Sequence, residues 1–300
     1  MEILRYEPEM ARRVAAIYNQ GVRGVPHCYP VRAARFAASL AAASGEGEGD
    51  KGLRSEAAFV AREGRSLLGF VHVAMERTRK DRPEKRGMIR FLWYRRGNRA
   101  AGESLRTTAE KYVRARGAGR IVAFPRHFRY PFYHFTNAFL SEHLDHVQAV
   151  FAFNGYRRVN GEVFLDWPDF KPVPPTRPGM EVQVSTEERA GPGKRPGLRV
   201  WAHRGGKQLG ECVCVSAAEW HDAEEAHDWV FTNWLGVERW AQGQGLGRYL
   251  LQHALREAHR LGYRHAAIST GWKNYRAFAF YSNYGYHMVD WTYQMERRLR

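Results

Sequence analysis

Apolar residues recur along the chain at two spacings, which predict strands and helices in alternation. Short apolar runs rich in β-branched and aromatic residues predict strands at 57–62, 66–75, 88–94, 198–203, 229–237 and 265–270. A spacing of three or four residues from Leu250 to Leu261 predicts a helix, and Gly262 is placed to end it. We therefore expect an α/β (α+β) protein in which helices flank mixed sheets.

The first 170 residues add a strand at 2–5 and helices at 8–19 and 31–43. A glycine-rich segment, 44–50, predicts a flexible loop. Glu63 and Gly64 are placed at the turn of a hairpin between the strands at 57–62 and 66–75.

A glycine-dense turn joins the strand at 229–237 to the helix that follows it. Gly243, Gly245 and Gly247 occupy alternate positions, and glycine permits positive φ angles and close approach of bare backbone to a ligand. A turn that enters a helix N-terminus directs unpaired N–H groups and the positive end of the helix dipole at one point. The turn is therefore predicted to bind an anion.

The spacing of these glycines excludes two nucleotide motifs and fits a third motif. A G-x-G-x-x-G fingerprint would need glycine at Arg248, and no G-K-[ST] follows. The stretch resembles the [QR]-x-x-G-x-[GA] signature of the GNAT N-acetyltransferase superfamily, in which this loop holds the pyrophosphate of coenzyme A. The cofactor-binding residues implied here are Gln242, Gly243, Gln244, Gly245, Leu246, Gly247 and Arg248.

A second stretch, 274–286, resembles the superfamily motif N-x-x-A-x-x-[FL]-Y-x-x-x-G-[FY]. Asn274 is predicted to cap a short helix, and Gly285 to end it before a strand at 289–295. The resemblance implies that Ala277 lets the cofactor pass and that Tyr281 is a general acid to the departing thiolate. A phenol suits this role because it stays protonated at neutral pH.

The strand at 229–237 resembles the superfamily's splayed strand, whose backbone at Leu235 and Val237 would bind the pantetheine amides. Gly236 is compatible with a bulge there. Many relatives carry a glutamate in mid-strand as a base, whereas this strand has Phe231-Thr-Asn233. The remaining candidates for a base are Asp228, which we carry forward, and Glu211, Glu219 and His221. A water relay, or an amine that arrives neutral, would need no dedicated base.

The first half of the chain predicts a degenerate copy of the same fold. Gly155 and Gly285 both begin a G-Y-x-x-V sequence, and their alignment replaces the acid tyrosine by a residue without a hydroxyl. The replacements are Leu144 for Asn274 and Phe151 for Tyr281. Aligning Gly102 with Gly247 places Gly97 and Ala100 at the positions of Gln242 and Gly245. We infer a half that no longer catalyses.

The predicted domains are a degenerate GNAT-like domain at 1–167, a proline-rich linker at 168–178 and a catalytic GNAT domain at 179–300. Each is expected to hold a mixed, mostly antiparallel twisted sheet flanked by helices. An aromatic insertion near 125–146 is expected to pack on the other half or to line a pocket. The second copy is too short at its start for two helices, an architecture that resembles tandem acetyltransferases such as mycothiol synthase.

Charge and cysteine content narrow the classes of partner. Residues 1–170 hold 29 basic and 18 acidic residues and 171–300 hold 18 and 13, so the halves carry +11 and +5. Ten of the basic residues lie in 77–99, but Arg outnumbers Lys 39 to 8, which indicates codon bias, and no base-reading motif is present. We do not expect nucleic acid as the main partner.

Cys212 and Cys214 are expected to be buried in a strand, with no metal site.

No apolar run is long enough to cross a membrane and the N-terminus lacks a signal-peptide pattern, so a cytoplasmic protein is expected. The resemblance implies an acetyl-CoA-dependent N-acetyltransferase, a monomer or homodimer, that acts by direct attack of the amine of a small or amino-acid-like acceptor. Two alternatives stay open: an acyltransferase with a longer acyl-CoA donor, and a non-catalytic regulator that binds coenzyme A or associates with nucleic acid.

Overall fold

The computed structural model describes residues 1–45, 50–77 and 83–299. Residues 46–49 of the predicted loop and residues 78–82 of the basic stretch lie outside this part of the chain. The residues group into two compact units, one formed by 1–162 with 290–300 and the other by 163–289. None of the helices in the described residues is long and apolar enough to span a membrane.

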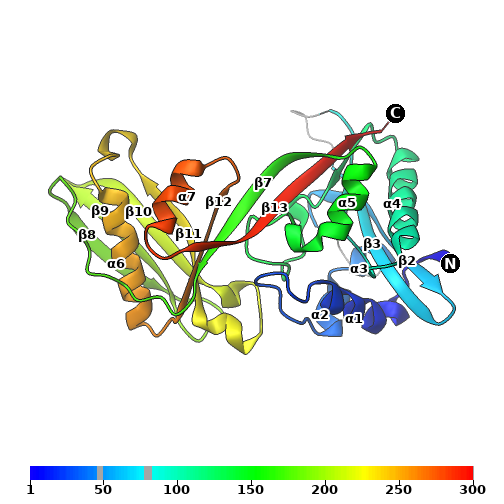
Figure 1. The fold of residues 1–300 in the computed structure, drawn as a ribbon, viewed down its shortest axis with the longest axis horizontal. Helices are drawn as coiled ribbons and strands as arrows, with labels where there is room; N and C mark the ends of the chain where they lie inside the picture. The colour runs from blue at the N-terminus through cyan, green and yellow to red at the C-terminus, as the bar shows by residue number, and fades with distance from the viewer. Residues whose placement is uncertain (46–49, 78–82, 300) are drawn as a thin grey trace. The chain divides into compact units, whose positions relative to one another are not determined.

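The first unit contains a sheet with the strand order β1-β2-β3-β4-β5-β13 and five helices (Figure 1). Its strands are β1 (Glu2–Arg5), β2 (Leu53–Glu63), β3 (Ser66–Glu76), β4 (Arg86–Tyr94), β5 (Arg120–Ala123) and a short β6 (Leu140–Ser141). Its helices are α1 (Ala11–Gly21), α2 (Ala33–Ala38), α3 (Ala41–Ser44), α4 (Arg99–Arg114) and α5 (Asp145–Phe153). In the described residues β4 and β5 are parallel, whereas the β1–β2, β2–β3, β3–β4 and β5–β13 pairs are antiparallel, which confirms a mixed, mostly antiparallel sheet.

Both faces of this sheet are covered. Successive residues of a strand point to opposite faces. On β4, Gly87 lies against Val113 of α4, whereas Met88 packs with Phe128 of the predicted aromatic insertion. The insertion therefore packs within its own unit, where Tyr130 stacks on Phe91 at a centroid distance of 5.5 Å.

The second unit repeats the pattern with the strand order β12-β11-β10-β9-β8 and a single parallel pair, β11–β12. Its elements are β8 (Gln183–Arg189), β9 (Gly197–Arg204), β10 (Lys207–Ser216), β11 (Trp229–Val237), α6 (Leu246–Arg260), β12 (His265–Gly271) and α7 (Tyr275–Ser282). Strand β8 was not predicted, because its sequence QVSTEER is polar and its side chains are mostly exposed at the edge of the sheet.

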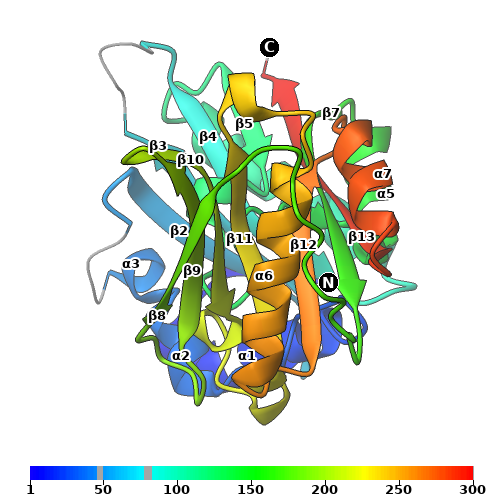
Figure 2. The same ribbon diagram turned by 90° about the vertical axis from the view of Figure 1, so that its left-hand side faces the viewer.

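Helix α6 covers one face of the second sheet (Figure 2). A Cβ on Gly210 would lie 3.1 Å from Leu250 of α6, and Cys212 and Cys214, on the same face of β10, are fully buried as predicted. The intervening residues Glu211 and Val213 are half-buried. As predicted from its shortness, the described segment between 179 and 197 contains no helix, only β8.

Two long strands belong to both units. Strand β7 (Arg157–Trp167) ends in the second unit, whereas β13 (His287–Arg298) ends in the first. Residues 295–298 of β13 pair with β5 from Ala123 to Arg120. The observed units therefore differ from the predicted domains, because 163–167 group with the second unit and 290–300 with the first.

The proline-rich segment 168–178 is extended, but it is not a free linker. Its Phe170 is buried, and Thr176 N–H donates to Oε1 of Gln252 on α6 at 2.8 Å. Gly179 N–H donates to the carbonyl oxygen of Gln244 at 2.8 Å. These contacts bind the segment to the second unit.

The shared strand predicts a long-range effect on stability. Met295 on β13 is 1% exposed and opposite Ala123 in the first unit, whereas Met288 on the same strand is 43% exposed in the second. Met295→Ala should lower the free energy of unfolding of the first unit by about 2–5 kcal/mol, because it deletes buried apolar volume. Amide hydrogen exchange should show the loss of protection in β4 and β5. Met288→Ala is the matched control, and a loss confined to β12 in Met295→Ala would contradict the assignment.

Candidate active site

A cleft opens in the second unit where two parallel strands separate. Strand β11 pairs with β12 only from Trp229 to Thr232. The next residue, Asn233, is extra, because Cys214 is opposite Thr232 whereas Val213 is opposite Trp234. This irregularity is the expected bulge, but it lies at Asn233 and not at Gly236. Beyond it the end of β11 is free of β12 and can present its backbone to a ligand.

The glycine turn closes one end of this cleft. Gly243 and Gly245 have φ angles of 81° and 82°, in the left-handed region that favours glycine. Gln242 Nε2 donates to the carbonyl oxygen of Val237 at 3.0 Å and so fixes the turn against the end of β11. Helix α6 then begins at Leu246 without a side-chain cap, which leaves its first N–H groups available to a ligand.

The turn, the end of β11 and helix α7 enclose a cavity of about 430 Å³. The residues that line it are Leu235, Val237, Gln242, Gly243, Gly245, Leu246, Gly247, Arg248, Asn274, Arg276, Ala277, Phe280 and Tyr281. All the predicted cofactor-binding residues are among them except Gln244, whose carbonyl holds Gly179. Sequence reasoning missed Arg276 and Phe280, although both lie inside the second motif.

The cavity is basic. Arg248 and Arg276 line it, and no carboxylate does so among the described residues. The Nε atom of Arg248 is buried without an acceptor in the described chain. An uncompensated guanidinium beside free helix N–H groups fits an anionic ligand such as a pyrophosphate.

A tyrosine also lines the cavity. Tyr281 is 8% exposed, and burial, followed by the proximity of Cys212, raises the pKa of its hydroxyl. The group therefore holds its proton throughout the neutral range. Asn274 positions the helix that carries it: its side-chain oxygen accepts from Ala277 N–H at 3.3 Å, which confirms the predicted cap.

The proposed bases lie elsewhere. Asp228 is at the opposite end of β11, where it pairs with Arg195 at 2.9 Å, and Glu211 pairs with Arg199 at 2.6 Å. Neither residue lines the cavity, and neither do Glu219 and His221. The position of Asp228 gives its assignment as a base no support.

The first unit has a strand, a connection and a helix at the corresponding place, but side chains fill the space beside the helix. Four residues join β4 to α4, whereas eight join β11 to α6. The residue before α4 is Asn98 with φ −109°, so Asn98, and not the predicted Ala100, takes the place of Gly245. A Cβ on Gly102 would lie 2.5 Å from the ring of Tyr94, which occupies the space next to the helix. The Tyr94 hydroxyl donates to the carbonyl oxygen of His146 at 2.9 Å.

The acid is missing there, as predicted. Leu144 precedes α5 without a side-chain cap, whereas Asn274 caps α7. Phe151, the seventh residue of its helix as Tyr281 is of α7, is fully buried and packs on Phe124 and Tyr156.

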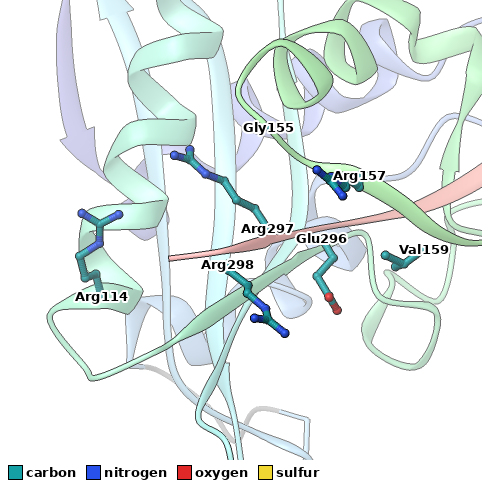
Figure 3. A pocket seen from close by; sticks show the side chains of 7 residues that line it. All are labelled: Arg114, Gly155, Arg157, Val159, Glu296, Arg297 and Arg298. Carbon is teal, nitrogen blue, oxygen red and sulfur yellow. The ribbon is translucent and has the colours of Figure 1, made fainter. Parts of the chain in front are cut away.

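Cavity volume alone does not identify the candidate active site. A larger cavity, of about 830 Å³, lies in the first unit, where Arg297 and Arg298 leave β13 in different directions (Figure 3). It is lined by Arg114, Gly155, Arg157, Val159, Glu296, Arg297 and Arg298. Three of the four arginines are solvent-exposed and none belongs to a predicted motif.

Part of the second unit matches one protein family. Residues 196–288 match the family model for an acetyltransferase (GNAT) domain. No curated protein sequence matches the chain.

Solved structures are similar over nearly the whole chain. A tandem GNAT protein from the clavulanic acid biosynthesis pathway has a TM-score of 0.67 at 13% identity and covers 99% of this chain and 98% of its own. A GCN5-related N-acetyltransferase from Sphaerobacter thermophilus has a TM-score of 0.62 at 14% identity and covers 100% and 96%. A fungal glucosamine N-acetyltransferase region has a TM-score of 0.63 at 15% identity, and the match covers 99% of this chain and 38% of that longer one. Residues 196–288 thus match the GNAT acetyltransferase family, and the chain has the fold of the tandem two-domain GNAT proteins.

Proposed function

We propose that the protein is an acetyl-CoA-dependent N-acetyltransferase whose second unit binds the cosubstrate and carries out the transfer to a small amine. The observation that carries this proposal is that one cavity is lined both by a basic anion-binding turn and by a buried tyrosine. We call this turn, residues 242–248, the cradle. Gly245, Gly247, Arg248 and Tyr281 all line the cavity. Such a lining suits a ligand that carries both a phosphate and a leaving group.

The residues have separate tasks in this proposal. The N–H groups at the start of α6 and the Arg248 guanidinium bind the pyrophosphate, because both are positive and lack a partner in the described chain. The backbone at Leu235 and Val237 orients the arm. Acetyl-CoA supplies an activated thioester, and the amine attacks its carbonyl carbon directly. Tyr281 donates its proton to the sulfur as the carbon–sulfur bond breaks.

Catalysis belongs to one unit only. In the first unit the ring of Tyr94 occupies the helix start and Phe151 has no proton to give. This unit offers neither the cradle nor the acid, so we assign to it a structural part in the reaction.

The lining supports a neutral amine as acceptor. Tyr281 is the only residue of the described lining whose hydroxyl can donate a proton, and no carboxylate or histidine joins it. An amine that enters without its proton attacks without help from a base, and the proton that its nitrogen gives up after the attack passes to water. The rate should therefore rise with pH toward the amine's own pKa.

Replacement of the acid tests the chemistry. Tyr281→Phe keeps the ring and removes the proton, so kcat for acetyl transfer should fall by about 100-fold. Coenzyme A binding, measured by calorimetry, should be unchanged. Tyr284→Phe is the matched control, because Tyr284 lies near the same helix but does not line the cavity. Thiol release should be followed with acetyl-CoA and longer acyl-CoA donors over a panel of amines. Full activity in Tyr281→Phe would refute the acid assignment.

Replacement of a glycine separates the cradle from the fold. A Cβ on Gly247 would meet only Val237, at 3.7 Å, so the fold has room for a side chain there. The motif that the turn resembles allows glycine or alanine at this position and nothing larger, so the branched side chain of Gly247→Val should weaken coenzyme A binding by about tenfold or more. The midpoint of thermal unfolding should change little. Gly119→Val in the first unit, where a Cβ also has room, should change neither quantity. Unchanged affinity in Gly247→Val would remove coenzyme A from this turn.

A further inference from the structure

The aromatic insertion of the first unit encloses a cavity that the proposed reaction does not use. Its volume is about 490 Å³, within the range of small-molecule sites. Three arginines contribute to it, together with a hydroxyl and an amide. The residues that line it are Asp50, Arg90, Arg126, His127, Arg129, Pro131, Thr136 and Asn137.

One of these arginines is neutralised within the protein. Arg90 is the extra residue of a bulge in β4, because His72 is opposite Phe91 whereas Val73 is opposite Ile89. Its guanidinium bonds to Glu56 at 2.8 Å, and its Nε donates to the carbonyl oxygen of Phe128 at 2.8 Å. Burial lowers the pKa of His72, also beside Glu56, to about 4. The imidazole is therefore neutral at pH 7, and the Glu56 charge is left to Arg90.

Arg129 has no such compensation. Its Nη1 donates to the carbonyl oxygens of Tyr130 and Tyr133 at 2.9 and 3.1 Å, and more weakly to that of Pro131 at 3.3 Å. In the described chain no group accepts from its other nitrogens and no carboxylate pairs with it. Burial lowers the pKa of this guanidinium to about 10, so enclosing its charge is costly.

The same cavity presents a second free cation. Arg126 has no ion pair among residues 1–45, 50–77 and 83–299. The carboxylate of Asp50, which also lines the cavity, accepts a hydrogen bond from the N–H of Gly52 at 3.1 Å. After Asp50 is counted against Arg126, the charge of Arg129 remains unbalanced.

A half-buried charge without an ion-pair partner keeps only part of its hydration, and an anionic ligand offsets that loss. We infer that this cavity binds one small oxyanion, the carboxylate or phosphate group of a small molecule, through Arg129 and Arg126. The planar guanidinium matches both groups in two-point geometry. Thr136 and Asn137 supply neutral hydrogen-bonding groups to the remainder of the ligand.

The larger arginine cavity of Figure 3 does not make the same case. Arg114, Arg157 and Arg298 are exposed, so water screens their charges at little cost. That cavity therefore supplies the matched control.

The test is calorimetric titration with two probes, inorganic phosphate and succinate, at constant ionic strength. The Gly245→Val background, in which the cofactor turn cannot adopt its positive φ, removes the competing anion site of the second unit. We expect one saturable site, and about tenfold weaker binding after Arg126→Ala, the loss of one charge-assisted contact. Arg298→Ala should bind as the background does. The probe that binds more tightly identifies the carboxylate or the phosphate.

Arg129→Leu provides the second variant. It should abolish binding. It also removes the donor to the carbonyl oxygens of Tyr130 and Tyr133, so the midpoint of thermal unfolding should fall, and the titration is made at a temperature at which circular dichroism shows the variant folded. Absence of saturable binding in the Gly245→Val background would overturn the proposal, as would equal weakening by Arg126→Ala and Arg298→Ala. Both results are independent of the acetyl-transfer assays, so this inference can fail while the proposed function stands.

Discussion

The site depends on one extra residue in a strand. Without Asn233, β11 would continue in register beside β12 and its backbone groups would be used within the sheet. The bulge ends that pairing, and the freed end of the strand leads directly into a turn that only glycine conformations allow. Cleft, cradle and helix start therefore follow from a single interruption of β-sheet hydrogen bonding.

The same interruption occurs in the first unit, with a different outcome. There the extra residue is Arg90, which is committed to Glu56, and the aromatic insertion packs against the sheet next to it. Tyr94 completes the closure at the helix start. Both units thus have a β-bulge at the corresponding place and differ in what fills the space beside it. In one unit the space stays open and basic, and in the other it is filled by a core with a charged pocket at its margin.

These comparisons show what could be predicted from the sequence. Motifs that fix backbone conformation locally were sufficient: glycines with positive φ, the Asn274 cap and the helix that carries Tyr281 all lie where expected. The lost acid at Phe151 followed from alignment of the copies. Properties set by distant contacts were out of reach. Asp228 is near β11 in sequence but is held by Arg195, and the unbalanced charge of Arg129 depends on which carboxylates fail to reach it. The split of the helix predicted at 31–43 into α2 and α3 likewise gave no signal in an alanine-rich stretch.

The shared strands also set an order of assembly during synthesis. Residues 163–289 are contiguous, so that unit has all its parts soon after its last strand segment leaves the ribosome. The unit that is synthesised first must wait, because the strand that pairs with β5 is made after everything else in the two units. Until then the edge of β5 offers unpaired backbone groups to any passing chain. The first unit is thus the more exposed to misassembly, and the second unit, to which we assign catalysis, can mature ahead of it.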